Sequence, residues 1–251
     1  MSGFYTDDPK ITIDQQGEGR PVLLLHGGGG PPSMGPLPSA LSEDFQVIAP
    51  VHPGFAGTPR PDWYDGIDDI ALSYLRLLED RDLRDVLVIG SSVGGWIASE
   101  MAAREHQRIS GTVLLDAVGI SVEGIELADF FSLTPQELIA RVFHDPAAAP
   151  DPTQLPQAAR DIQAANAATL AVYAREPYMH DPKLRRRLAL VPTPVVAIWG
   201  ESDRIAPEPY GRAYAASFPH GRFELIREAG HLPHLEQPEP VVEAIQRFAH
   251  G

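Results

Sequence analysis

One serine of this chain lies in a pattern suited to nucleophilic chemistry. The apolar run Val86 to Ile89 leads into Gly-Ser-Ser-Val-Gly at residues 90–94, a Gly-x-Ser-x-Gly sequence with Ser92 at its centre, and then into a helix-like stretch. A serine on so sharp a strand-to-helix turn adopts a positive φ and tolerates only small residues two places away, which Gly90 and Gly94 provide. The same five residues also fit a plain glycine-rich turn, so the rest of the chain must decide between the two interpretations.

A serine hydroxyl becomes a strong nucleophile when a neighbouring base takes its proton and a third group orients that base. Asp203 lies on a tight loop directly after the strand-like run Val195 to Trp199, and we predict it as the acid. His231 follows the last predicted strand, and we predict it as the base. The chain order Ser92, Asp203, His231 is the order that a parallel sheet with this kind of serine turn requires.

Other acids and histidines lie close by in the sequence. Asp116, which ends the run Thr112 to Leu115, is the alternative acid, and Glu201 is expected to be solvated. His234 is expected to point elsewhere, and His250 lies at the end of the chain. Taken alone, Asp203 also fits a turn-forming or helix-capping aspartate.

A glycine-rich loop offers a place for negative charge. His26 and the glycines at 27–30 follow the predicted strand Val22 to Leu25, so backbone N–H groups can turn toward the serine. We predict an oxyanion hole made by the N–H groups of Gly28 and Val93, with Gly27 as neighbour. The glycine spacing does not match a dinucleotide-binding loop, and no Gly-Lys-Ser/Thr follows for a phosphate-binding loop.

Composition excludes several classes of protein. The 251 residues include no cysteine, so disulfides, thiolate metal sites and cysteine nucleophiles are ruled out. The formal charge of −14 disfavours nucleic acid, and the basic cluster Lys183 with Arg185, Arg186 and Arg187 is expected to be a solvated helix face. No apolar run approaches the roughly 20 residues that span a bilayer, and the polar amino terminus is unlike a signal peptide. We therefore predict a cytoplasmic protein without membrane or nucleic-acid partners.

The elements that must position these residues follow an α/β rhythm. Short apolar runs alternate with helical patterns, which favours a doubly covered, mostly parallel sheet. An extended piece, Lys10 to Asp14, is expected to pair antiparallel at one edge. The remaining predicted strands are Val22 to Leu25, Gln46 to Ala49, Val86 to Ile89, Thr112 to Leu115, Val195 to Trp199 and Arg222 to Ile226, and the predicted helices are Ile67 to Asp80, Val93 to Arg104, Pro209 to Phe218 and Pro240 to Ala249.

The rhythm breaks in the middle of the chain. Thr134, Pro135 and Glu137 form a capping box that predicts a helix start, and an alanine-rich stretch, Gln157 to Arg175, is also predicted as a helix. We predict that residues 119–188 form a helical cap inserted into a core domain made of residues 1–118 and 189–251.

These pieces resemble the α/β-hydrolase superfamily over nearly the full chain. The resemblance rests on His26-Gly27-Gly28, the turn at residues 52–57, the Ser92 pentapeptide, Trp199 to Asp203, and Gly230 to Pro233. It implies an α/β fold with an eight-stranded, mostly parallel sheet, flanking helices and a cap. It also implies Ser92 as nucleophile, His231 as base, Asp203 as acid and an oxyanion hole on the glycine loop.

The resemblance narrows the expected activity to a serine hydrolase. Dehalogenases and epoxide hydrolases of the superfamily carry aspartate where Ser92 stands, and C–C bond hydrolases usually have asparagine and tryptophan where Ser91 and Leu232 stand. We predict a carboxylesterase-like enzyme that cleaves small apolar esters, with no cofactor and no metal. The cap aromatics Phe130, Phe131, Phe143, Tyr173 and Tyr178, with Trp96, are candidates for the acyl pocket.

Three alternatives stay open. They are a C–C bond hydrolase, a cofactor-free oxygenase or lyase on the same scaffold, and a ligand-binding receptor without turnover. The partner predicted in every case is a small molecule, and no pattern in the chain speaks to its oligomeric state.

Overall fold

The structure is a computed structural model that describes residues 10–105, 107–147, 149, 151 and 154–251. The amino-terminal stretch on which the expectation about a signal peptide rests therefore lies almost wholly outside the described residues. Across the described ranges, none of the helices combines the length and the apolar character needed to cross a bilayer.

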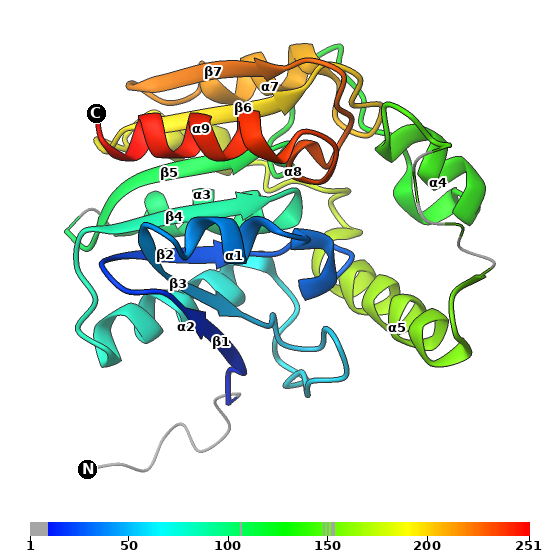
Figure 1. Cartoon of the computed structure of the whole chain (residues 1–251), viewed down its shortest axis with the longest axis horizontal. Coiled ribbons are helices and arrows are strands. Elements are labelled where there is room, and N and C mark those ends of the chain that lie inside the picture. Colours follow the sequence, from blue (N-terminus) through cyan, green and yellow to red (C-terminus); the bar gives the residue numbers. More distant parts are fainter. Residues whose placement is uncertain (1–9, 106, 148, 150, 152–153) are drawn as a thin grey trace.

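A seven-stranded sheet forms the centre of the molecule (Figure 1). The strands are β1 (Ile13–Gln16), β2 (Arg20–Leu25), β3 (Phe45–Pro50), β4 (Val86–Ser91), β5 (Ile109–Leu115), β6 (Val195–Gly200) and β7 (Gly221–Ile226). They lie in the order β1-β3-β2-β4-β5-β6-β7, with β1 antiparallel to β3 and every other pair parallel. The predicted parallel strands and the antiparallel edge strand are confirmed, with boundaries that differ by a few residues.

The expectation of eight strands is wrong, because the described chain forms seven. That number came from the resemblance, whereas the sequence holds seven extended runs and each forms one strand. After β1 the chain turns through Gly17 and Gly19, which have φ values of 71° and 104°, and enters β2 directly. No extended run is left over between the two for an eighth strand.

Helices cover both faces of the sheet. They are α1 (Leu37–Leu41), α2 (Ile67–Asp80), α3 (Val93–Ala102), α4 (Pro135–Val142), α5 (Gln157–Ala174), α6 (Leu184–Leu188), α7 (Glu208–Ala215), α8 (Pro233–Glu236) and α9 (Pro238–Ala249), with 3₁₀ turns at Pro31–Met34 and Phe130–Ser132. The predicted helices are all present, and α6 carries the basic cluster that was expected on a helix face, whereas the short helices α1 and α8 were not predicted. Helices of four or five residues carry too little periodicity to stand out in a sequence.

Alternation along the strands builds two hydrophobic layers. Leu23 and Leu25 of β2 pack into the layer that contains α2, α3, α6 and α7, whereas Val22 and Leu24 pack into the layer with α1 and α9. Successive side chains of a strand point to opposite faces, so a strand covered on both sides reads as an unbroken apolar run. This explains why β2 shows no polar alternation.

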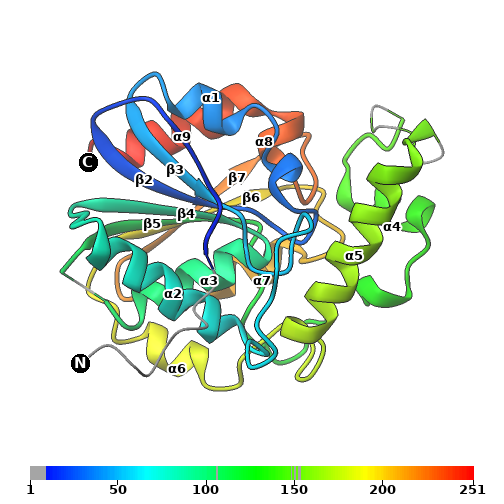
Figure 2. The same cartoon turned by 90° about the horizontal axis from the view of Figure 1, so that it is seen from below.

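The segment between β5 and β6 is helical. Figure 2 shows α4 and α5 beyond the ends of the strands, to one side of the sheet and its covering helices. Helix α4 begins as predicted, because the Thr134 hydroxyl oxygen accepts from the Glu137 amide and the Glu137 carboxylate accepts from the Thr134 amide. Farther along the segment, Leu184 and Leu188 of α6 are fully buried in the same hydrophobic layer as α2 and α3.

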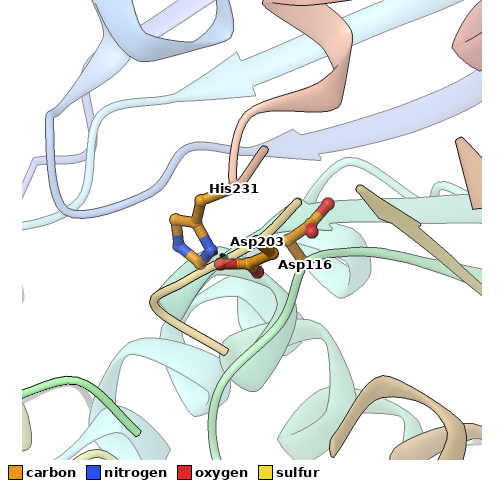
Figure 3. Close-up of side chains that lie close together, drawn as sticks. All are labelled: Asp116, Asp203 and His231. Atoms are coloured by element: carbon orange, nitrogen blue, oxygen red, sulfur yellow. Dashed lines mark hydrogen bonds and ion pairs between the residues drawn. The ribbon is translucent and has the colours of Figure 1, made fainter. Parts of the chain in front are cut away.

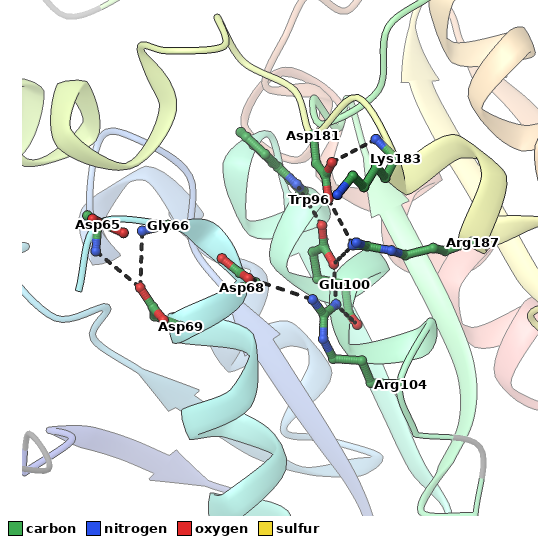
Figure 4. A network of polar contacts seen from close by, with 10 residues as sticks. All are labelled: Asp65, Gly66, Asp68, Asp69, Trp96, Glu100, Arg104, Asp181, Lys183 and Arg187. Carbon is green, nitrogen blue, oxygen red and sulfur yellow. Dashed lines mark hydrogen bonds and ion pairs between the residues drawn. The ribbon is translucent and has the colours of Figure 1, made fainter. Parts of the chain in front are cut away.

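An ionic network around the buried Glu100 connects this segment to α3 (Figure 4). Glu100 of α3 is 1% exposed and pairs with Arg104, while Arg187 of α6 lies 3.6 Å from Glu100 and 2.8 Å from Asp181. Burial raises the pKa of the Glu100 carboxyl, and the contact with Arg104 opposes that rise. Arg187 of the basic cluster predicted as a solvated face therefore pairs with the buried Glu100, whereas Arg185 and Arg186 are exposed.

Candidate active site

Ser92 occupies a strained turn between β4 and α3. Its φ is 53° and its ψ −117°, a conformation that costs a residue other than glycine about 1–3 kcal/mol. A Cβ on Gly90 would lie 2.2 Å from the Gly94 carbonyl oxygen, and a Cβ on Gly94 would lie 2.3 Å from the carbonyl oxygen of Leu25. The two glycines are thus required by the close approach of strand, helix and the neighbouring β2, as the pattern predicted.

The backbone of Ser92 is held from both sides. Its amide donates to the Leu115 carbonyl at 2.9 Å, and its own carbonyl accepts from Gly95 at 3.0 Å and from Val118 at 3.2 Å. The residue as a whole is only partly buried. The turn therefore holds Ser92 in one position at the carboxyl edge of the sheet.

A continuous hydrogen-bonded chain links the three predicted residues. The Nε2 atom of His231 lies 3.0 Å from the Ser92 hydroxyl oxygen, and its Nδ1 atom lies 2.8 Å from Oδ2 of Asp203. Because a carboxylate only accepts, Nδ1 carries the proton and Nε2 is free to accept from Ser92. This is the tautomer that a general base for Ser92 needs.

The remaining oxygen of Asp203 is also satisfied. Its Oδ1 atom accepts from the amides of Ile205 at 2.8 Å and Ala206 at 3.0 Å, and the side chain is fully buried. Three donors around one carboxylate stabilise its charged form and fix its orientation.

The alternative acids and histidines take other places. Glu201 is exposed and accepts from the Glu228 amide, and Asp116 is buried but bonded to the Gly200 amide rather than to His231. His234 binds the Ser33 carbonyl, and His250 bonds to the carbonyl of Gln246 near the carboxyl terminus. Of the candidates named, the structure brings Asp203 and His231 to Ser92.

The predicted oxyanion residues, Gly27, Gly28 and Val93, differ in burial and surroundings. Gly27 is buried, and a Cβ placed on it would lie 3.3 Å from the Cβ of Ser92. Val93 is the first residue of α3, so its N–H has no acceptor within the helix. Gly28 is half-buried beneath Leu170 of α5, whose Cδ2 would lie 2.8 Å from an added Cβ. Their role as donors to an oxyanion stays a prediction.

Two buried histidines fix the glycine loop. The His52 amide donates to Nε2 of His26 at 3.0 Å, so His26 carries its proton on Nδ1 and donates to the Gly27 carbonyl at 2.8 Å. His52 in turn donates from Nε2 to the His26 carbonyl at 2.8 Å, while its Nδ1 atom lies 2.5 Å from the Tyr74 hydroxyl. Burial lowers the pKa of His26 to about 4 and that of His52 well below its usual value. Both rings are therefore neutral near pH 7 and hold the peptide of Gly27 in one orientation.

Helix α5 closes over the same loops. Asn166, which is 2% exposed, accepts from the Ala56 amide at 2.8 Å and donates to the Gly29 carbonyl at 3.2 Å. Thr169 and Tyr173 of the same helix donate to the carbonyls of Gly54 and Pro53. Asn166 was not predicted, although an amide flanked on both sides by pairs of alanines in the helical stretch was the available signal.

The end of α4 docks on the loops that carry the acid and the base. The His231 amide donates to the Val142 carbonyl at 2.6 Å, and the Arg204 amide donates to the Arg141 carbonyl at 3.2 Å. Glu236 of α8 accepts from the amides of Gly230, at 2.7 Å, and His144, at 2.9 Å. Glu236 was not predicted, because its partners lie 6 and 92 residues away and no local pattern marks them.

The aromatic side chains predicted to line an acyl pocket lie in different surroundings. Tyr173 is 5% exposed and Trp96 4%, and Trp96 packs against Gly119. Phe131 and Tyr178 line a cavity of about 360 Å³ together with Asp129, Ser132, Arg175 and Glu176. Neither Ser92 nor His231 lines this cavity, so the assignment of an acyl pocket stays a prediction.

One group of potential metal ligands lies together in the described part of the chain. Atoms of Asp116, Asp203 and His231 are all within 4.8 Å of one another (Figure 3). Since Asp203 and His231 bond to each other, a cation would have to replace that bond. The geometry suits a hydrogen-bonded acid–base pair better than a metal centre.

Comparison with known proteins agrees with this geometry. Residues 22–244 match the profile of the alpha/beta hydrolase family. The chain belongs to this family. An alpha/beta hydrolase needs a nucleophile turn, an acid loop and a histidine loop at one sheet edge, and this member has candidates at all three positions.

Relatives of this alpha/beta hydrolase carry more than one activity in their names. It is 26% identical to a 2-hydroxymuconate semialdehyde hydrolase from Pseudomonas putida, over 95% of this chain and 90% of that protein. It is 28% identical to a pimeloyl-[acyl-carrier protein] methyl ester esterase from Aromatoleum aromaticum, over 92% of this chain and 98% of the relative. The structure of a thermophilic esterase from Thermogutta terrifontis superposes with a TM-score of 0.77 at 23% identity, covering 96% of this chain and 93% of that one. That superposition shows the shared fold.

Proposed function

We propose that this protein is a serine hydrolase that cleaves small, largely apolar carboxylic esters or related acyl compounds through an acyl-enzyme on Ser92. The observation that carries the proposal is the unbroken chain of hydrogen bonds from Ser92 through His231 to Asp203. The named methyl ester esterase among the relatives supports the ester bond as the target.

In the proposed cycle, the Ser92 hydroxyl oxygen attacks the substrate carbonyl while Nε2 of His231 takes its proton. The bond to the leaving alcohol then breaks, and His231 returns the proton to the alcohol oxygen. Water enters, gives a proton to His231 and attacks the acyl-enzyme, which releases the acid and restores the Ser92 hydroxyl. Asp203 stays ionised throughout and stabilises the imidazolium.

We assign stabilisation of the negative charge on the tetrahedral oxygen to the N–H groups of Val93 and Gly28, with Gly27 as neighbour. The neutral His26, by holding the Gly27 carbonyl, keeps this loop in place without bringing a second cation to the site. Loss of one such donor typically lowers turnover about a hundred- to a thousand-fold.

We assign residues 119–188 the role of a cap over this site. The contacts of Leu170 with Gly28 and of Asn166 with the glycine loop support that role. The apolar side chain over Gly28 favours a substrate that is apolar beside its reacting carbonyl.

A C–C bond hydrolase is the second candidate, and the named semialdehyde hydrolase among the relatives favours it. Against it stand Ser91 and Leu232, at positions where such enzymes usually carry asparagine and tryptophan. Both candidates use the same serine and base, so the substrate distinguishes them.

The test is turnover of p-nitrophenyl esters of increasing acyl length beside one C–C hydrolase substrate. We expect hydrolysis of short esters by the wild type and loss of at least about a thousand-fold in Ser92→Ala. The matched control is Ser91→Ala, because Ser91 is the adjacent buried serine and its hydroxyl has no partner among the described residues. Equal turnover by wild type and Ser92→Ala would overturn the proposal, and turnover of the C–C substrate alone would replace it with the second candidate.

A further inference from the structure

Asp116 is a second buried carboxyl beside the acid–base pair, and the proposed cycle gives it no role. Figure 3 shows Asp116, Asp203 and His231 converging from three loops, which follow the neighbouring strands β5, β6 and β7. Asp116 is 0% exposed, and one of its carboxyl oxygens lies within 4.8 Å of a carboxyl oxygen of Asp203 and of a ring nitrogen of His231. Two carboxylates at this separation away from water repel each other strongly unless one is neutral.

The backbone of Asp116 holds it there at a cost. Its φ is 45°, in the left-handed region, which costs about 1–3 kcal/mol and persists only where surrounding contacts fix it. Its amide donates to the Ile198 carbonyl at 3.1 Å, and its Oδ1 atom accepts from the Gly200 amide at 2.9 Å. These bonds tie the end of β5 to the end of β6, where the loop to Asp203 begins.

A count of hydrogen-bond donors tells the two carboxyls apart. Asp203 receives three donors, from Ile205, Ala206 and His231, so both of its oxygens are satisfied as a carboxylate. Asp116 receives one donor on Oδ1, while its Oδ2 atom is buried and has no donor among the described residues. If Asp116 were ionised, the Oδ2 atom of a buried carboxylate would have no hydrogen-bond donor. If Oδ2 is protonated, it becomes a donor itself.

We infer that Asp116 carries a proton and uses it to donate a hydrogen bond to the Asp203 carboxylate, which makes Asp116 a positioning residue for the Asp203 and His231 pair. Burial and the negative charge of Asp203 raise the pKa of Asp116 well above its usual value, in agreement with this assignment. The groups that face Asp116 are Asp203, His231 and, farther away, Glu236 of α8, and only His231 among them can become positive. The catalytic part of the inference rests on the proposed function, and the protonation state does not.

The first experiment therefore needs no turnover. In protein labelled with ¹³C at the aspartate carboxyl carbons, we expect one resonance at the position of a carboxylic acid from pH 5 to pH 8, absent in Asp116→Asn. The exposed Asp80→Asn is the matched control and should leave that resonance in place. If every aspartate titrates as a carboxylate at neutral pH, the inference is overturned whether or not the protein is a hydrolase.

The second experiment measures the positioning role. Asparagine at 116 replaces the hydroxyl donor by an amide N–H, whereas alanine removes it, so we expect kcat of Asp116→Asn to exceed that of Asp116→Ala by about tenfold, with similar KM. The acid limb of the kcat/KM profile should stay at the wild-type pH in Asp116→Asn. A downward shift of roughly one pH unit or more would mean that a negative charge had been removed beside His231, and it would contradict the inference.

Discussion

Acid stability should depend on His234, a histidine buried in α8 beyond the active site. Its Nε2 atom donates to the Ser33 carbonyl at 2.9 Å, and its Nδ1 atom is buried without a partner among the described residues. A proton added at Nδ1 would meet no acceptor, and burial lowers the pKa of His234 from 6.5 to about 4. Between these two pKa values, His234 is protonated in the unfolded chain and neutral in the folded protein, so the free energy of unfolding falls as the pH falls.

The magnitude follows from the two pKa values. Between pH 7 and pH 5, this one group should lower the unfolding free energy by about 2 kcal/mol, a sizeable part of the 5–15 kcal/mol typical of a domain. The perturbation is His234→Gln, whose amide N–H retains the bond to Ser33 and cannot be protonated. Urea unfolding followed by circular dichroism should show that the variant loses about 2 kcal/mol less than the wild type over this range.

A matched exposed variant completes the acid-stability experiment. His220 is exposed and lies in the turn before β7, so His220→Gln controls for the loss of an imidazole as such. If His234→Gln and the wild type lose the same free energy between the two pH values, the argument from the orphaned Nδ1 atom is refuted.

Three further perturbations probe the loops around the serine. Gly90→Ala puts a Cβ 2.2 Å from the Gly94 carbonyl oxygen, and we expect a loss of about 1–3 kcal/mol in urea unfolding together with loss of turnover; wild-type stability would contradict the close approach. Glu236→Ala leaves the Gly230 amide without its acceptor at 2.7 Å, so kcat should fall roughly tenfold while KM changes little. An unchanged kcat would show that turnover does not need the hydrogen bond between Glu236 and Gly230. Asn166→Ala removes the hydrogen bonds from α5 to the Ala56 amide and the Gly29 carbonyl, and hydrogen exchange of the amides in these two loops should accelerate. Unchanged exchange would show that Asn166 does not hold the loops.

Much of the fold was predictable because its signals are local. A strand covered on both faces has to be apolar throughout, so β4 and β6 appear directly in the sequence as runs. The turn at Ser92 imposes glycines at 90 and 94, and this requirement is also local. The prediction of eight strands was wrong because it came from the resemblance, whereas the extended runs in the sequence number seven.

The rest depends on contacts between distant residues. Asp116 and Asp203 both follow strands directly, and only the path of the loop after β6 determines which carboxylate meets His231. Glu236 and Asn166 bind backbone groups whose positions follow from tertiary packing, so residue types alone do not identify these partners. A single sequence shows which loops carry polar side chains to a site. It does not show which of those side chains form hydrogen bonds with one another.

Covalent labelling shows whether His231 makes the Ser92 hydroxyl reactive. After treatment with a fluorophosphonate, we expect one added probe mass on the intact protein, located on the peptide that bears Ser92. His231→Ala should label far more slowly, and Ser92→Ala should not label at that peptide. An unmodified Ser92 peptide in folded wild-type protein, or labelling that proceeds equally well without His231, would mean that His231 does not activate Ser92.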